Sequence, residues 1–184
     1  MSVNIYAYWG PRKRVAEALI PQLQAHFHAL AAADERLASW ALLGRSLKKA
    51  MTSEPIDTSA SGNLLQMLKK GQNKTDMAPR QPIPELGYRI SLWNQRRGDV
   101  EASTSAQGGA YSEYLSQDSQ NNASLELNYM VGAKPLGAQV LLALFERLVE
   151  IWNPTGVRFG AMSRKGIRPV RVNILRVPDM PFIN

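Results

Sequence analysis

The sequence predicts an α+β fold with a largely antiparallel sheet. Apolar residues recur at helical spacing after the first strand and again near the C-terminal end, whereas elsewhere they alternate with polar residues, as in half-buried strands. The resulting order of strand, helices, strands, helix and strands is typical of an α+β protein. The 184 residues contain no internal repeat. We therefore expect one domain over residues 1–177 and a proline-punctuated tail over 178–184.

The first strand is expected over residues 3–8 and ends at a corner. Gly10 tolerates backbone angles closed to other residues, and Pro11 suits the first position of a helix. An amphipathic helix over 11–33 follows, with an apolar residue at every fourth position: Val15, Leu19, Leu23 and Phe27. Pro21 lies inside this helix and predicts a kink or a break just before it. Core packing is expected for three tryptophans: Trp9, Trp40 and Trp152.

The remaining N-terminal helices are shorter. A second helix is expected over 34–43, and an irregular polar segment follows over 45–59. A third helix begins near Ser59 or Ser61, either of which could cap it, and ends at Gly71. The later elements, in order, are a loop over 72–84, a hairpin of strands 86–93 and 100–104 with a turn at 94–98, a polar loop over 107–122, a strand over 123–131, a central helix over 135–152, a strand over 157–161, a basic turn over 163–168 and a strand over 170–174.

Composition excludes several classes of protein. The chain contains no cysteine, so disulfides, thiolate nucleophiles and cysteine-ligated metals are excluded. No apolar run approaches the length of a membrane span or of a secretory signal, so we expect the chain to act in the cytoplasm, where it is made. The formal net charge is +7, and basic residues gather without acids between 156 and 176. This segment is either a solvated face or a surface for nucleic acid, an acidic membrane or an acidic protein.

The sequence offers little catalytic chemistry. His26 and His28 point about 200° apart on a helix, so they cannot share a metal ion, and each is expected to be a partly exposed structural histidine. Asp99 and Glu101 form the only close alternating acidic pair and could hold Mg²⁺, although a solvent-facing edge is the favoured interpretation. We therefore predict no catalytic residue, no metal site and no cofactor.

A series of short segments resembles one known family. The segments, in order, are Tyr8-Trp-Gly-Pro-Arg12, Leu37 with Trp40, Gly44-Arg-Ser46, Leu68 with Gly71-Gln-Asn73 and Asp76, Leu86-Gly-Tyr88, Leu92-Trp-Asn94, Gly108-Gly-Ala-Tyr111, 122–127 and Trp152-Asn-Pro154. Together they resemble the immunity protein 52 family, the antidotes encoded beside polymorphic toxins and type VI secretion effectors of bacteria. The sequence departs from the family at Gln95, where glycine is more usual, and at Pro21.

The resemblance implies a non-enzymatic protein that binds and neutralises a cognate toxin in the producing cell. Partners of this family are often nucleases with a restriction-endonuclease-like fold. Such nucleases need carboxylates for their metal, and an inhibitor of charge +7 is steered toward an acidic cleft. The inhibitor either covers that cleft, covers another face or disturbs the assembly of the toxin.

Candidate toxin-binding residues follow from physics, because Trp, Tyr and Arg are enriched among interface anchors. Tyr111 and Tyr114 lie in the long polar loop, and Arg96 and Arg97 lie at the hairpin turn. Trp93 is either exposed beside that turn or buried under a helix.

Two other functions compete with toxin binding. The first alternative is a basic accessory protein that binds nucleic acid; it is disfavoured because aromatic residues are not interleaved with the basic ones between 156 and 176. The second is a small enzyme that uses Asp99 and Glu101.

Overall fold

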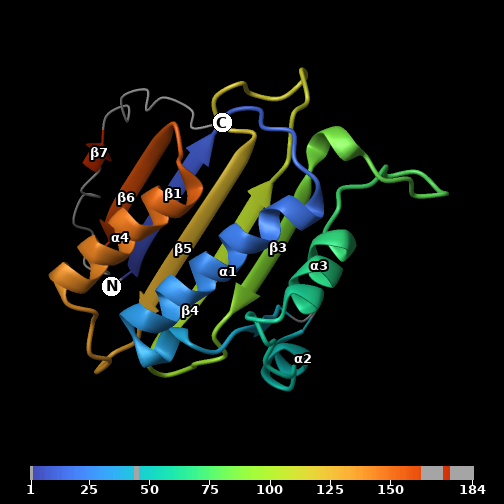
Figure 1. The fold of residues 1–184 in the computed structure, drawn as a ribbon. Helices are drawn as coiled ribbons and strands as arrows, with labels where there is room; N and C mark the ends of the chain where they lie inside the picture. The colour runs from blue at the N-terminus through green and yellow to red at the C-terminus, as the bar shows by residue number, and fades with distance from the viewer. Residues whose placement is uncertain (1, 44–45, 163–171, 175–184) are drawn as a thin grey trace.

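The first strand, β1 (Ser2–Trp9), lies inside the sheet rather than at its edge. A computed structural model describes residues 2–43, 46–162 and 172–174, and it shows a seven-stranded sheet in the order β2-β3-β4-β5-β1-β6-β7 (Figure 1). Every neighbouring pair of strands is antiparallel. The other strands are β2 (Ala41–Leu42), β3 (Tyr88–Trp93), β4 (Val100–Gly108), β5 (Asn121–Tyr129), β6 (Gly156–Met162) and β7 (Val172–Ile174). The predicted α+β class and antiparallel sheet are confirmed.

Helices cover one face of this sheet. Two of them, α1 (Ala16–Ala33) and α4 (Ala138–Trp152), cross the front of the sheet in Figure 1, and α3 (Ser61–Lys70) lies beside α1. Strand residues alternate accordingly: in β1 the odd-numbered residues are buried with the helices and the even-numbered ones are only half-buried. The hydrophobic core therefore lies between the sheet and these helices.

Aromatic rings hold the helices to the sheet. Trp9, at the end of β1, stacks on Trp152, at the end of α4, with 5.3 Å between ring centroids. Trp40 packs against Phe27 of α1, and its indole Nε1 donates to the carbonyl oxygen of Leu37. All three tryptophans are buried, which confirms their expected place in the core.

His26 lies at the centre of this core and is only 1 % exposed, so the expected partial exposure is wrong for this residue. The indole Nε1 of Trp152 donates to its Nδ1 at 3.1 Å, and its Nε2 lies 2.9 Å from the hydroxyl of Thr104. That hydroxyl itself donates to the carbonyl oxygen of Ser124, so Nε2 carries the proton that it donates to Thr104. The imidazole is therefore neutral and joins α1, α4, β4 and β5.

Two elements differ from the expected ones near α1. The helix begins at Ala16 and runs without a break through Pro21, so the expected break is wrong. Pro21 lies in the second helical turn. Because proline has no backbone N–H, the hydrogen bond that is lost is the one to the carbonyl oxygen of Glu17 in the first turn. Residues 11–15 are not helical, and the backbone N–H of Arg12 bonds to the carbonyl oxygen of Ala110 beyond β4.

The segment after α1 is not a second helix. It contains a 3₁₀ turn, η1 (Glu35–Leu37), capped by the side chain of Asp34, and then β2 at the sheet edge. A short helix, α2 (Leu47–Met51), occupies part of the segment expected to be irregular. Ala60 is the N-cap of α3, so neither Ser59 nor Ser61 caps it. A second 3₁₀ turn, η2 (Pro84–Leu86), precedes β3.

The expected basic turn over 163–168 and the tail over 178–184 lie outside the described residues. Among the helices that the structure describes, none has the length and apolar character needed to cross a membrane.

We predict that His26 makes the free energy of unfolding depend on pH. Burial lowers its pKa from 6.5 to about 4, so between these values the unfolded chain binds a proton that the folded chain does not. Stability is therefore full above pH 6.5 and falls by about 3 kcal/mol as the pH drops to 4. Denaturant unfolding of the wild type and of His26→Gln over this range measures the difference. Replacement of the exposed His28 by Gln is the control, and an equal loss in the wild type and His26→Gln would contradict the prediction.

Candidate functional site

The sheet face opposite the helices carries polar side chains and is named here the open face. Its residues alternate with the core residues along each strand and are half-buried or exposed: Ser2, Asn4, Tyr6, Tyr8, Arg89, Ser91, Glu101, Ser103, Ser105, Gln107, Asn122, Ser124, Glu126, Asn128 and Arg158. Of the described helices only α2 packs on this side, where its Ala50 covers Trp93 and Ala41 at one corner. As far as the structure describes the chain, the rest of this polar face is available to a partner.

The open face is hollowed at its middle. The hollow, named here the serine groove, has a volume of about 460 Å³ and is lined by Ser91, Ser103, Ser105 and Ser124 among others. Strand register places Ser91 beside Ser105 and Ser105 beside Ser124, and the last two hydroxyl oxygens are 2.8 Å apart. Larger side chains also line the groove: Asn4, Tyr6, Leu43, Arg89 and Glu126. The hollow exists because small side chains from three adjacent strands meet in one place.

Two tyrosines and an arginine lie beside the groove. The rings of Tyr6 and Tyr8 are 5.9 Å apart, and the guanidinium of Arg158 lies over the ring of Tyr8 at 5.3 Å. Tyr6 is paired with both Ser124 and Arg158 across the strands, so this cluster continues the groove toward β6. Tyr and Arg are, with Trp, enriched among the residues that contribute most to protein interfaces.

The loop over 109–120 carries Tyr111 and Tyr114 at one end of the sheet. Asn121 closes the base of this loop: its amide nitrogen donates to the carbonyl oxygens of Gly10 and Ala110, and its Oδ1 accepts from the N–H of Ala110. Tyr111 lies under the ammonium of Lys13 at 5.0 Å. Tyr114 is 91 % exposed. The loop therefore presents a tyrosine to solvent from an anchored base.

The turn over 94–99 carries Arg96 and Arg97 at the opposite end of β4, and both side chains are exposed. Asn94 closes this turn. Its amide donates to the carbonyl oxygens of Arg36 and Val100, and its Oδ1 accepts from the N–H groups of Arg96 and Ala102.

Gln95 follows Asn94 with a φ of 55°, a conformation that favours glycine. Its side-chain amide donates to the carbonyl oxygens of Ala50 and Ser53, at the C-terminal end of α2. Gln95 therefore joins the turn to α2, a contact that glycine could not make.

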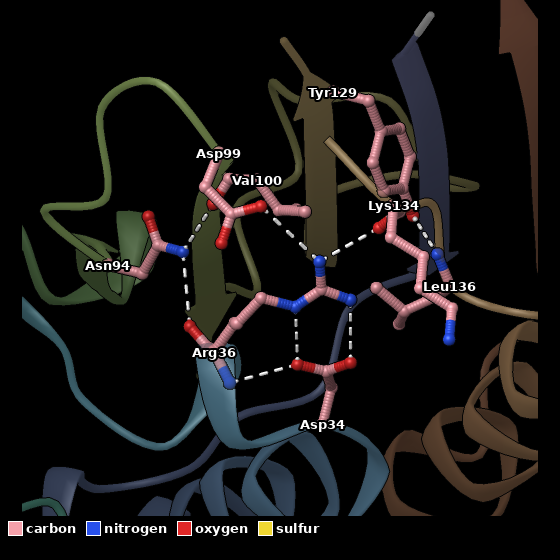
Figure 2. Close-up of polar contacts among 8 residues, drawn as sticks. All are labelled: Asp34, Arg36, Asn94, Asp99, Val100, Tyr129, Lys134 and Leu136. Carbon is pink, nitrogen blue, oxygen red and sulfur yellow. Dashed lines mark hydrogen bonds and ion pairs between the residues drawn. The ribbon is translucent and has the colours of Figure 1, made fainter. Parts of the chain in front are cut away.

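Arg36 holds the same end of the sheet together (Figure 2). Its guanidinium makes two hydrogen bonds to the carboxylate of Asp34, donates to the carbonyl oxygen of Lys134 at 2.8 Å and lies 3.4 Å from Asp99. These contacts hold the pKa of the Asp34 carboxyl below its ordinary value. Tyr129 completes the cluster, because its hydroxyl accepts from the N–H of Leu136. Asp99 is thus part of an ion pair, whereas Glu101 lies on the open face.

The five predicted binding residues do not form one cluster. Nine residues of β4 separate the turn from the loop, which is about 30 Å at the rise of a strand. Trp93 is only 4 % exposed and packs under α2, so it is buried rather than exposed beside the turn. Its indole Nε1 has no hydrogen-bond partner among the described residues. Across all the residues that the structure describes, no group of three or more His, Asp or Glu side chains could hold a metal ion.

The sequence analysis did not predict the serine groove. The available signal was the alternation of serine with apolar residues, at Ser91 in one strand, Ser103 and Ser105 in the next and Ser124 in a third. Alternation identifies a solvent-facing row within each strand. It does not give the register that brings the rows together.

Tyrosine and arginine side chains, which are enriched among the residues that dominate protein interfaces, lie on and around this open polar face. The family model of Immunity protein 52 matches residues 4–172, and the chain therefore belongs to this family of immunity proteins. Membership implies that the chain binds a cognate toxin. No curated protein matches the chain.

We predict that Asn94→Ala lowers the free energy of unfolding by about 2–3 kcal/mol. The substitution leaves buried backbone groups of Val100 and Ala102 without their partner, and Asn94 itself is only 4 % exposed. Denaturant unfolding monitored by tryptophan fluorescence measures the change. Asn128→Ala is the matched control, because that amide makes an exposed contact with Glu126, and it should change stability by less than about 0.5 kcal/mol. Equal effects of the two substitutions would contradict the prediction.

Proposed function

We propose that this protein neutralises its cognate toxin by forming a stoichiometric complex with it, without catalysing a reaction. The observation that carries the proposal is the family match over 4–172. The open face and the two anchored loops support it, since both offer surface for a partner without any rearrangement of the core. Preorganised contact surfaces avoid the entropy cost of ordering loops upon binding.

We further propose that the toxin is a secreted antibacterial nuclease with a restriction-endonuclease-like fold, delivered by a type VI secretion system. The formal net charge of +7 supports this, because the metal-binding carboxylates of such a nuclease attract a basic inhibitor. A nuclease of this kind attacks DNA in the cytoplasm, so the immunity protein would act there. Inhibition follows either from covering the active cleft or from disturbing the assembly of the toxin.

We predict a tight complex between this protein and the toxin encoded by the adjacent reading frame. Size-exclusion chromatography with light scattering should show the complex, and the protein should abolish the activity of the toxin at molar equivalence. An enzyme that destroyed the toxin or its product would act at far lower ratios. Protection by a hundredfold deficit of the protein would therefore contradict the proposal.

A salt titration separates this proposal from nucleic-acid binding. Affinity of a protein for random DNA falls steeply and linearly with the logarithm of salt concentration as counterions are released. We expect no such binding to a random duplex, because the described open face carries Glu101 and Glu126 as well as arginines. Steep, salt-dependent binding to the duplex together with no binding to the toxin would favour the nucleic-acid alternative.

We predict that Tyr111 and Tyr114 contact the toxin directly. Tyr114→Ala should weaken the complex at least about tenfold, since aromatic anchors at interfaces commonly contribute more than 1.4 kcal/mol. Its 91 % exposure means that the melting temperature should not change. Val131→Ala is the matched control, because Val131 is 89 % exposed at the opposite end of β5. Calorimetric titration of both variants with the toxin tests this, and unchanged affinity for Tyr114→Ala contradicts it.

Arg96 and Arg97 are proposed to act on association. They lie at the far end of β4 from Tyr111 and Tyr114, and exposed charges away from the centre of an interface change the association rate more than the dissociation rate. Replacing both with Ala should slow association at low salt and leave the dissociation rate unchanged in surface plasmon resonance. A faster dissociation would instead place them in direct contact. The proposed role of Trp93 is to hold α2 and the turn in place, since the side chain is buried.

A further inference from the structure

The geometry points to the serine groove as the part of the surface that receives the toxin. We propose that it binds a segment of the toxin that brings an acidic group to Arg89 and a basic group to Glu126. This inference rests on the proposed function, and it names the surface and the chemistry of the contact.

The side chains that line the groove suit it to bind a segment of another protein. Its serines present hydroxyl groups without bulk, and each hydroxyl can donate or accept a hydrogen bond. Tyr6 and Leu43 line it as well, and Leu43 is a solvent-exposed apolar side chain. A partner segment therefore meets both apolar surface and hydrogen-bonding groups, and specific interfaces combine the two.

The two charged side chains that line the groove form no ion pair with any residue that the structure describes. The ion pairs of the described residues are those of Arg36 with Asp34 and Asp99, Lys69 with Glu17, and Arg147 with Glu150. Arg89 and Glu126 are thus without an ion-pair partner in the described part of the chain, and both are exposed. A partner that supplied the opposite charges would neutralise both.

Strand register gives the spacing that such a partner must match. Arg89 is paired with Gln107, and Glu126 with Ser103, so the two charges lie four residues apart along β4 and two strands apart across the sheet. At ordinary strand spacings this is about 16 Å. An extended segment of about five residues spans that distance. The groove thus suits a short stretch of protein with an acidic and a basic side chain near its two ends.

The same charges disfavour nucleic acid as the occupant. A phosphate backbone is negative along its whole length and would meet Glu126 in the groove and Glu101 beyond it. Only a partner that carries both signs is complementary at both positions. A protein segment is such a partner.

A double charge reversal tests local complementarity. Arg89→Glu together with Glu126→Lys reverses the polarity of the groove and leaves the net charge at +7. We expect affinity for the catalytically inactivated toxin of the adjacent reading frame to fall at least about tenfold, with an unchanged melting temperature. Steering by net charge alone predicts no loss. The matched control is the double reversal Arg147→Glu with Glu150→Lys, an exposed pair on α4 at the helical side of the molecule, which should bind like the wild type.

Filling the groove tests its shape independently. Ser105→Phe places an aromatic ring on the floor, and a solvent-facing strand position tolerates an aromatic residue. Toxin binding should again fall at least tenfold, and circular dichroism should stay that of the wild type.

Each outcome decides the inference. If both groove variants are folded and bind the toxin like the wild type, the groove is not the contact surface, while the proposed function stands. If Ser105→Phe does not fold, the charge reversal decides, because it changes only exposed side chains. If the wild-type protein itself does not bind the toxin, the proposed function and this inference both fall.

Discussion

The packing of α1, α3 and α4 on one face of the sheet, with only α2 among the described helices on the other, is the constraint on which the rest of this structure depends. An antiparallel strand alternates its side chains between two faces, so each strand here carries one apolar row against the helices and one polar row against solvent. The stack of Trp9 on Trp152 and the neutral imidazole of His26 hold α1 and α4 on the apolar face. Apart from the corner under α2, the described residues leave the other face open for a partner.

Side-chain hydrogen bonds hold the loops at the two ends of β4 in place. A buried asparagine fixes the chain at each end of β4: Asn94 at the turn before it and Asn121 at the base of the loop after it. Their side-chain amides bond to backbone groups that include Arg36 and Gly10, far away in the sequence. Polar side chains were needed there because the backbone groups at strand ends lack ladder partners and are costly to bury unpaired. The arginines and tyrosines at the two ends are held by these closures, so in the proposed complex the toxin would meet surfaces already in place.

The strands and the central C-terminal helix could be predicted because their period is local. Alternation at Ile90 and Leu92 or at Leu125 and Leu127 depends only on which face is buried, and α4 has a wide apolar stripe. The predicted elements were wrong where contacts between distant parts of the chain decided the structure. The segment before α1 is extended and bonds to Ala110, and residues 41–42, which look helical by composition, pair with β3 at the sheet edge.

The sequence by itself determined the fold class, the family and the residue types suited to an interface, because composition, period and short motifs are local properties. Only the tertiary structure decided that His26 is buried, that Trp93 lies under α2 and that Arg96 and Tyr114 lie at opposite ends of the sheet. The serine groove is likewise a feature that only the tertiary structure decided. Its floor comes from three strands whose serines become neighbours through register, and register is set by long-range pairing that no local pattern encodes.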